Sequence, residues 1–128
     1  ERIVEGARSD SGPQIELEVL AEHAPANVAN CFAAVLREAL SNAMRHAHAK
    51  TITVRCMEHP SFYQLIVTDD GTGATKTNSR GIAEGMGLGS MRERVEALGG
   101  TFTAGPRAGA PGWRVFATVP KQQGDEAR

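Results

Sequence analysis

Apolar residues along the chain follow two different periods, and together these periods predict five strands and two helices. Apolar and charged residues alternate over 15–19, a pattern typical of a half-buried strand. Two runs rich in β-branched and aromatic residues flank a turn at 59–61 and predict a hairpin. The five predicted strands cover residues 15–19, 51–56, 63–67, 101–103 and 113–119.

Apolar residues at spacings of three and four predict a long helix near residues 26–48, opened by Pro25, and a second helix over 88–98. Gly99 and Gly100 follow the second helix, as glycine often does just past a helix end. A third, short helix is left open. One sheet with its helices on one face, an α+β fold, is the economical packing of these elements.

Residues 71–87 follow neither period. They hold five glycines with polar residues between them, and they offer little to bury: Gly71, Gly73, Gly81, Gly85 and Gly87. Long loops without secondary structure are uncommon in compact domains and are usually functional. We therefore expect a mobile, functional loop here.

Length and charge restrict the class of protein. The 128 residues suit one domain with one core. The 14 Lys and Arg against 15 Asp and Glu argue against a nucleic-acid binder or a membrane-surface binder, which would need a basic excess. No apolar run reaches the roughly 20 residues of a membrane helix, so we expect no membrane contact by this fragment.

We expect a linker at 1–13, a domain at 14–120 and a polar tail at 121–128. The chain opens without an initiator Met or a signal peptide. We therefore expect a domain of a longer, cytoplasmic or membrane-anchored protein, with the domain itself in the cytoplasm.

Four polar residues of the first helix fall within about 100° of arc, on a face expected to lie opposite much of the apolar stripe: Glu38, Asn42, Arg45 and His46. A solvated polar face is the ordinary interpretation of such a group. However, Asn is a poor helix former, and its amide oxygen is a hard ligand that suits hydrated Mg²⁺. Glu38 could orient a metal-bound water or accept a proton, and Arg45 could face a phosphate.

Two carboxylates end the third predicted strand, in the stretch Asp69-Asp70-Gly71-Thr72-Gly73. Asp-Gly by itself predicts no more than a turn. A carboxylate at a strand end can also accept a hydrogen bond from an exocyclic amine, and the two glycines leave room for a flat base.

The stretch Gly85-Met86-Gly87-Leu88-Gly89 runs into the second helix. The free N–H groups and the dipole of a helix N-terminus favour phosphate there. The stretch is not a P-loop, because no Gly-Lys-Ser/Thr follows it. Together with the polar helix face and the strand-end carboxylates, it predicts a pocket for a nucleotide and its metal.

The three pieces, in this order, resemble the N, G1 and G2 boxes of the ATP-binding catalytic domain of sensor histidine kinases. Residues 37–47 and 87–100 are similar to the subfamily that pairs with LuxR-type or NarL-type response regulators. The resemblance covers about residues 14–120.

The resemblance implies the Bergerat fold of the Hsp90, gyrase B and MutL ATPases. This fold is a two-layer α/β sandwich with a mixed five-stranded sheet, helices on one face and a glycine-rich ATP lid, here residues 74–86. It implies that Glu38 and Asn42 are catalytic, that Asn42 binds Mg²⁺ and that Asp69 accepts a hydrogen bond from the adenine amine. The implied ATP-binding residues are Asn42, Arg45, His46, Asp69, Gly71, Gly73, Gly85, Gly87, Leu88 and Gly89.

The resemblance also implies partners. The γ-phosphoryl group would pass to a histidine on a separate dimerisation domain of a homodimeric parent kinase, and then to a response regulator. The four histidines of this chain lack an acceptor-like neighbour, since Ala or Pro follows each of them.

One departure from the family concerns the turn before the last strand. Many relatives have a Gly-Gly-Gly-Thr-like turn there, whereas residues 109–113 read Gly-Ala-Pro-Gly-Trp. The contact made by that Thr is therefore in doubt. Three alternatives stay open: an ATP hydrolase of the same fold with Glu38 activating water, an anti-sigma-type serine kinase, and a non-catalytic nucleotide sensor.

Overall fold

The structure of the protein is a computed structural model, which describes residues 14–20, 24–44, 49–71, 87–107 and 109–122. Within these ranges seven elements follow one another: β1 (Gln14–Leu20), α1 (Ala26–Asn42), β2 (Thr51–Glu58), β3 (Phe62–Asp69), α2 (Leu88–Glu96), β4 (Thr101–Pro106) and β5 (Trp113–Pro120). All five predicted strands and both predicted helices are confirmed.

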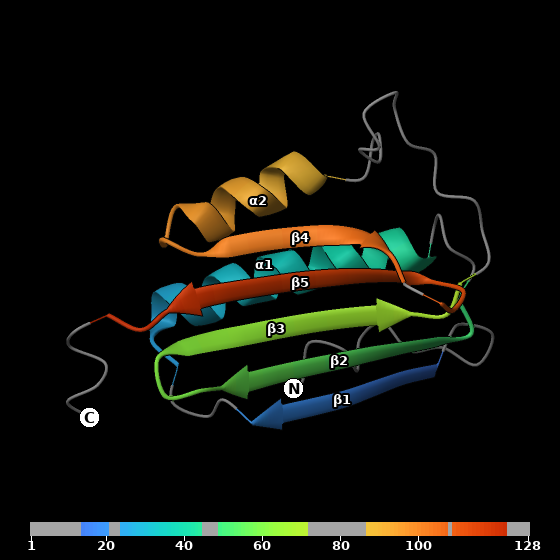
Figure 1. Ribbon diagram of the computed structural model, residues 1–128, viewed down its shortest axis with the longest axis horizontal. Coiled ribbons are helices and arrows are strands. Elements are labelled where there is room, and N and C mark those ends of the chain that lie inside the picture. The colour runs from blue at the N-terminus through green and yellow to red at the C-terminus, as the bar shows by residue number, and fades with distance from the viewer. Residues whose placement is uncertain (1–13, 21–23, 45–48, 72–86, 108, 123–128) are drawn as a thin grey trace.

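The five strands form one mixed sheet in the order β1-β2-β3-β5-β4 (Figure 1). β1 runs parallel to β2, with α1 as the crossover between them, and the other neighbouring pairs are antiparallel. The predicted α+β fold, a mixed five-stranded sheet with its helices in a second layer, is confirmed. β3 and β5 are neighbours in the sheet although α2 and β4 lie between them in the chain.

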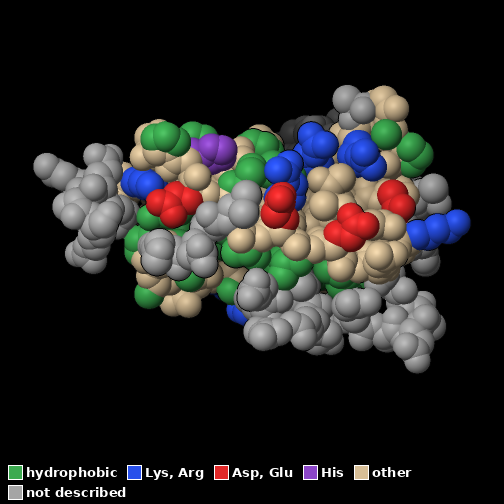
Figure 2. All heavy atoms as spheres, turned by 90° about the horizontal axis from the view of Figure 1, so that it is seen from below, with side chains coloured by type: hydrophobic (Ala, Val, Ile, Leu, Met, Phe, Trp, Pro, Cys, Tyr) green, Lys and Arg blue, Asp and Glu red, His purple; other side chains and the backbone are tan. Residues whose placement is uncertain are grey.

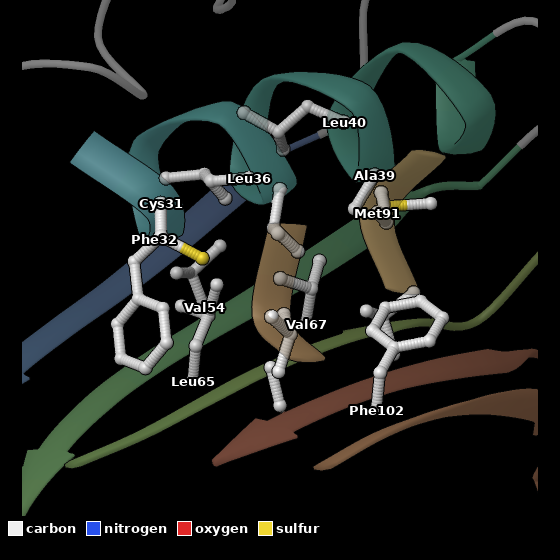
Figure 3. Close-up of a cluster of buried hydrophobic side chains, with 14 of the residues drawn as sticks. Cys31, Phe32, Leu36, Ala39, Leu40, Val54, Leu65, Val67, Met91 and Phe102 are labelled. Carbon is white, nitrogen blue, oxygen red and sulfur yellow. The ribbon is translucent and has the colours of Figure 1, made fainter. Parts of the chain in front are cut away.

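One hydrophobic core fills the space between the sheet and the two helices (Figure 3). Its members come from α1, from every strand and from α2, where Met91 and Val95 are almost fully buried. Along β3 the buried residues alternate strictly, and Asp69 stands at the end of this buried row. The period of two therefore gives Asp69 the same side of the sheet as the core residues.

The ends of the helices differ from the prediction. α1 ends at Asn42 and continues as a π turn at Ala43 and Met44, while residues 45–48 of the predicted helix lie outside the described residues. α2 ends at Glu96, two residues before the predicted end. A left-handed glycine follows it, Gly99 at φ +78°, which is typical of a helix C-terminus.

The surface seen from the β1 edge mixes acidic and basic side chains over the described residues (Figure 2). Across β1 and β2, Arg55 Nε lies 2.7 Å from Glu18 Oε1. This view shows no broad field of one sign, in line with the balanced charge of the sequence. Neither described helix is long and apolar enough to cross a membrane.

Candidate functional site

Four chain segments that carry the predicted site residues meet at one end of the molecule. The C-terminal end of α1, the end of β3, the start of β5 and the N-terminus of α2 all lie at this end (Figure 1). The antiparallel pairing of β3 and β5 places Asp69 directly opposite Trp113. The topology therefore brings together residues that are far apart in the sequence.

Asp69 is a buried carboxylate on the helix side of the sheet, with 6% of its surface exposed. Its Oδ1 accepts a hydrogen bond from the backbone N–H of Gly71 at 2.8 Å. Burial raises the pKa of Asp69, and the nearby Asp70 carboxylate adds to this effect. The backbone N–H groups of Gly71 and Trp113 and the charge of Arg107 act in the opposite direction without cancelling the rise in pKa. A ligand that donates a hydrogen bond here would offset part of the cost of burying this carboxylate.

Asp70 has a different role, although it is the next residue. Its Oδ1 accepts hydrogen bonds from the backbone N–H groups of Lys50 and Thr51, each at 2.9 Å, and its own N–H donates to the Thr51 carbonyl at 3.2 Å. These hydrogen bonds lower the pKa of Asp70, and the bond from Thr51 has the largest effect. Asp70 thus fixes the start of β2 against the end of β3, whereas Asp69 faces the helix layer.

The expectation that Asn42 lies on a face opposite the apolar stripe is wrong. Asn42 is 4% exposed, and its amide oxygen is itself buried. It follows Val35 by seven residues, which is close to two helical turns, and so it shares the buried side of α1. Glu38 is half-buried. Arg45 and His46, the other two residues predicted for this face, lie outside the described residues.

Gly87 brings the predicted glycine-rich stretch into contact with the predicted polar residues of the first helix. It is the N-cap of α2 and has a left-handed backbone, φ +69°. A Cβ placed on Gly87 would lie 2.9 Å from both Cδ and Oε2 of Glu38, so the Glu38 carboxylate packs against the start of α2. The sequence predicted both residues as part of the site but could not predict that they touch.

The other predicted glycine-loop residues differ in their surroundings. Gly89 is exposed, and a Cβ placed there would have no neighbour within 4 Å. Leu88 is partly buried and packs against the core, which makes it an anchor for the start of α2. Gly73, Gly85 and the predicted lid at 74–86 lie outside the described residues.

The β4–β5 loop supplies residues that the sequence did not predict for the site. Gly112 has φ +125°, and a Cβ there would overlap the backbone carbonyl of Asp69. Arg107 donates its backbone N–H to the Gly112 carbonyl at 3.0 Å and its guanidinium to the Pro111 carbonyl at 3.2 Å. Trp113 follows with 8% of its surface exposed. Gly112, just before β5, was the sequence signal that could have identified this loop as part of the site. It could not be interpreted in that way without knowing that β3 pairs with β5.

This arrangement of a buried carboxylate, a buried amide and a glycine-capped helix can be compared with known proteins. Residues 27–123 match the family described as "Histidine kinase-, DNA gyrase B-, and HSP90-like ATPase". The chain belongs to this family. The predicted resemblance is thereby confirmed, and so is the prediction of an ATP-binding domain.

Sensor kinases are among the similar curated proteins. The chain is 35% identical over 88 residues to the signal transduction histidine-protein kinase/phosphatase UhpB of Salmonella typhimurium, covering 69% of this chain and 16% of UhpB. It is 36% identical over 96 residues to the nitrate/nitrite sensor protein NarQ of Escherichia coli, covering 73% of this chain and 16% of NarQ. The matched part of the chain thus spans about one sixth of the length of these relatives.

Solved structures show the same fold at lower identity. The catalytic domain of the histidine kinase ThkA superposes with a TM-score of 0.72 at 15% identity, covering 97% of this chain and 88% of that one. The blue-light activated histidine kinase EL346 of Erythrobacter litoralis gives 0.75 at 20% identity, covering 93% of this chain and 39% of that one. The fold is therefore that of histidine kinase catalytic domains.

Proposed function

We propose that this chain is the catalytic domain of a two-component sensor histidine kinase, and that it binds Mg-ATP and donates the γ-phosphoryl group to a histidine on a separate dimerisation domain. The observation that carries the proposal is Asp69, a buried carboxylate at a strand end, facing the helix layer beside Gly71 and Trp113. Membership in the ATPase family and the sensor-kinase relatives support it.

Asp69 binds the adenine amine in this proposal. Oδ1 already accepts the Gly71 N–H, which fixes the orientation of the carboxylate. A carboxylate oxygen has several lone-pair positions, so the group can accept the amine as well. Gly71 is buried and has no side chain, which leaves space for a planar ring. Gly73, outside the described residues, extends this space in the proposal.

Asn42 and Glu38 form the phosphate side of the site. The amide oxygen of Asn42 is the kind of hard ligand that Mg²⁺ accepts, and Mg²⁺ is usually held by few protein groups together with phosphates. The described residues contain no cluster of three or more His, Cys, Asp or Glu side chains that could hold a metal. When bound, Mg²⁺ would neutralise phosphate charge.

Gly87 and Gly89 let the backbone at the start of α2 approach the phosphates, where helix N–H groups favour anions. Glu38 lies against Gly87, so its carboxylate is positioned close to the same helix start. In the proposal this carboxylate supports the attacking group or the water around the metal. Arg45, His46, Gly85 and Leu88 complete the proposed ATP contacts. Catalysis in phosphoryl transfer is mainly positioning and charge stabilisation, and these residues provide both.

The wider setting of the proposal follows from the short span of the chain. The matched part of the chain covers 16% of each of these two sensor-kinase relatives. In the proposal, the phosphoacceptor histidine, the signal-sensing part and the dimer contacts belong to other segments of a homodimeric parent. A response regulator would receive the phosphoryl group. We place the domain in the cytoplasm, because its proposed substrate is ATP and its proposed partner is a response regulator.

The binding part of the proposal is tested with two neighbouring aspartates. Asp69→Asn removes the charge that accepts the amine and should weaken ATP binding by about 1.5–3 kcal/mol, measured by calorimetry. Asp70→Asn is the matched control, because its remaining oxygen can still accept from Lys50 and Thr51. It should bind ATP as the unaltered protein does. Equal affinities for both variants would contradict the assignment of Asp69.

The metal part is tested by comparing ATP binding with Mg²⁺ and with EDTA. Asn42→Ala should weaken binding strongly when Mg²⁺ is present and little when it is chelated. Equal losses under both conditions would argue against metal ligation by Asn42.

The transfer part is tested with γ-labelled ATP. This chain alone should acquire no acid-labile phosphate, because its own histidines lack an acceptor-like context. Addition of the parent's helical dimerisation domain should produce label on that domain. Rapid release of inorganic phosphate without any labelled protein would instead favour the ATP hydrolase, with Glu38 activating water.

A further inference from the structure

Trp113 carries a buried polar group that the proposed function does not use. Its indole N–H group, at Nε1, is buried, and it has no hydrogen-bond partner in the part of the chain that the structure describes. Trp113 has 8% of its surface exposed and belongs to the core. Buried donors in native proteins nearly always have a partner, so one without a partner points to a group that arrives from outside.

Strand pairing places Trp113 beside Asp69, the residue of the proposed base site. Trp113 lies directly opposite Asp69 in the antiparallel β3–β5 register. Both residues are on the buried side of the sheet, where side chains at directly opposite positions are neighbours. Gly112 comes so close to the Asp69 backbone that no side chain fits between the strands there. The strand pairing thus fixes the backbones of Asp69 and Trp113 relative to one another.

Asp69 and Trp113 offer a hydrogen-bond acceptor and a hydrogen-bond donor from directly opposite positions of β3 and β5. Adenine presents the complementary pair, because its exocyclic amine is a donor and the ring nitrogens next to that amine are acceptors. Guanine has the acceptor O6 in place of the amine, so it would face the Asp69 carboxylate with a second acceptor.

We propose that the Trp113 indole N–H group recognises the base, donating a hydrogen bond to the adenine ring nitrogen next to the amine held by Asp69. The inference rests on the proposed function, since it requires that Asp69 accept the adenine amine. Trp113 is then a specificity-determining residue at the start of β5, at the end of the stretch that lacks the Thr of many relatives.

The test compares Trp113→Phe with the unaltered protein, using ATP, 1-deaza-ATP and 7-deaza-ATP as ligands in calorimetry. Phe keeps a ring in the core and removes the donor. Loss of one neutral hydrogen bond should weaken ATP binding about three- to tenfold. The analogue that lacks the accepting nitrogen should bind both proteins equally, while the other analogue should show the same loss as ATP.

This pattern separates recognition from altered packing. A Trp113→Phe variant that is merely distorted would weaken ATP and both analogues by one common factor, and that result would overturn the inference. Unchanged ATP affinity would overturn it as well. Tyr63→Phe is the matched control, because it removes a hydroxyl group from a buried aromatic residue at the opposite end of β3, paired with Val119. It should bind all three nucleotides as the unaltered protein does.

Failure of the inference is distinguishable from failure of the proposed function. If Asp69→Asn weakens ATP binding while Trp113→Phe leaves it unchanged, the base site stands and the role of Trp113 is refuted. If Asp69→Asn has no effect, the base site itself is wrong, and the inference is overturned with it.

Discussion

Replacing Gly87 by Ala should destabilise the protein, and two properties of this glycine determine by how much. Its backbone is left-handed, φ +69°, and a Cβ there would lie 2.9 Å from the carboxylate of Glu38. Gly87→Ala therefore meets both backbone strain and a close contact. Gly89 is the matched control two residues later, because a Cβ there has no neighbour within 4 Å.

Backbone strain is expected to account for most of the loss of stability. A left-handed conformation costs an L-residue about 1–2 kcal/mol. The contact with Glu38 costs less, because the end of a flexible side chain can move away. Gly87→Ala should thus lower the free energy of unfolding by about 1–2 kcal/mol. Gly89 lies within the first turn of α2. Because Ala has a higher helix propensity than Gly, Gly89→Ala should raise the free energy of unfolding by up to about 1 kcal/mol.

Urea unfolding of both variants measures these differences, and a third protein separates the two causes. Gly87→Ala should cost about the same when Glu38 is already Ala, because the backbone strain remains. A much smaller cost in that background would show that the side-chain contact dominates. Full stability of Gly87→Ala in the presence of Glu38 would refute the left-handed N-cap, and with it the reasoning given for this glycine.

Three further predictions concern other parts of the chain. Asp70→Ala should lower the free energy of unfolding by about 1–3 kcal/mol at neutral pH. Because the folded state lowers the pKa of Asp70, its contribution is complete above the ordinary value of 3.8 and disappears as pH falls through the lowered pKa, so unfolding curves of both proteins should converge in acid. Gly100→Ala should destabilise the fold by more than 2 kcal/mol in the same assay, because its Cβ would overlap the Thr118 carbonyl. Trp113 is the single tryptophan, so the tryptophan fluorescence of the protein should change on addition of ATP or adenosine but not of inorganic triphosphate. A fluorescence change with triphosphate alone would indicate that the base does not bind beside Trp113.

The fold was predictable because its periods are strong. The alternation in β3 and the three-and-four spacing in α1 each have one dominant face, and burial in the structure follows both. The position of Asn42 was mispredicted because its polarity was taken as a sign of exposure. Counting seven residues from Val35 would have placed it on the buried side.

The pairing of segments was the part that the sequence could not supply. Nothing in the local pattern says that β5, rather than β4, lies beside β3. Without that register Trp113 is an ordinary core aromatic residue, and the two adjacent aspartates look equivalent. The contact of Glu38 with Gly87 depends in the same way on how α1 packs against α2, which is set by the whole core.

The neighbourhood of β3 and β5 also has a consequence for how the protein reaches its native state. The chain must close a long loop containing α2 and β4 before Asp69 and Trp113 can meet. The conformational entropy of this loop is lost before the contacts between β3 and β5 can stabilise the fold. A site assembled from such distant segments does not exist in the unfolded chain. A nucleotide that binds it acts on the native state alone, and at one hundred times its dissociation constant it would add about 2.7 kcal/mol to the free energy of unfolding. The cellular level of ATP would then influence how much of this domain is folded as well as how fast it works.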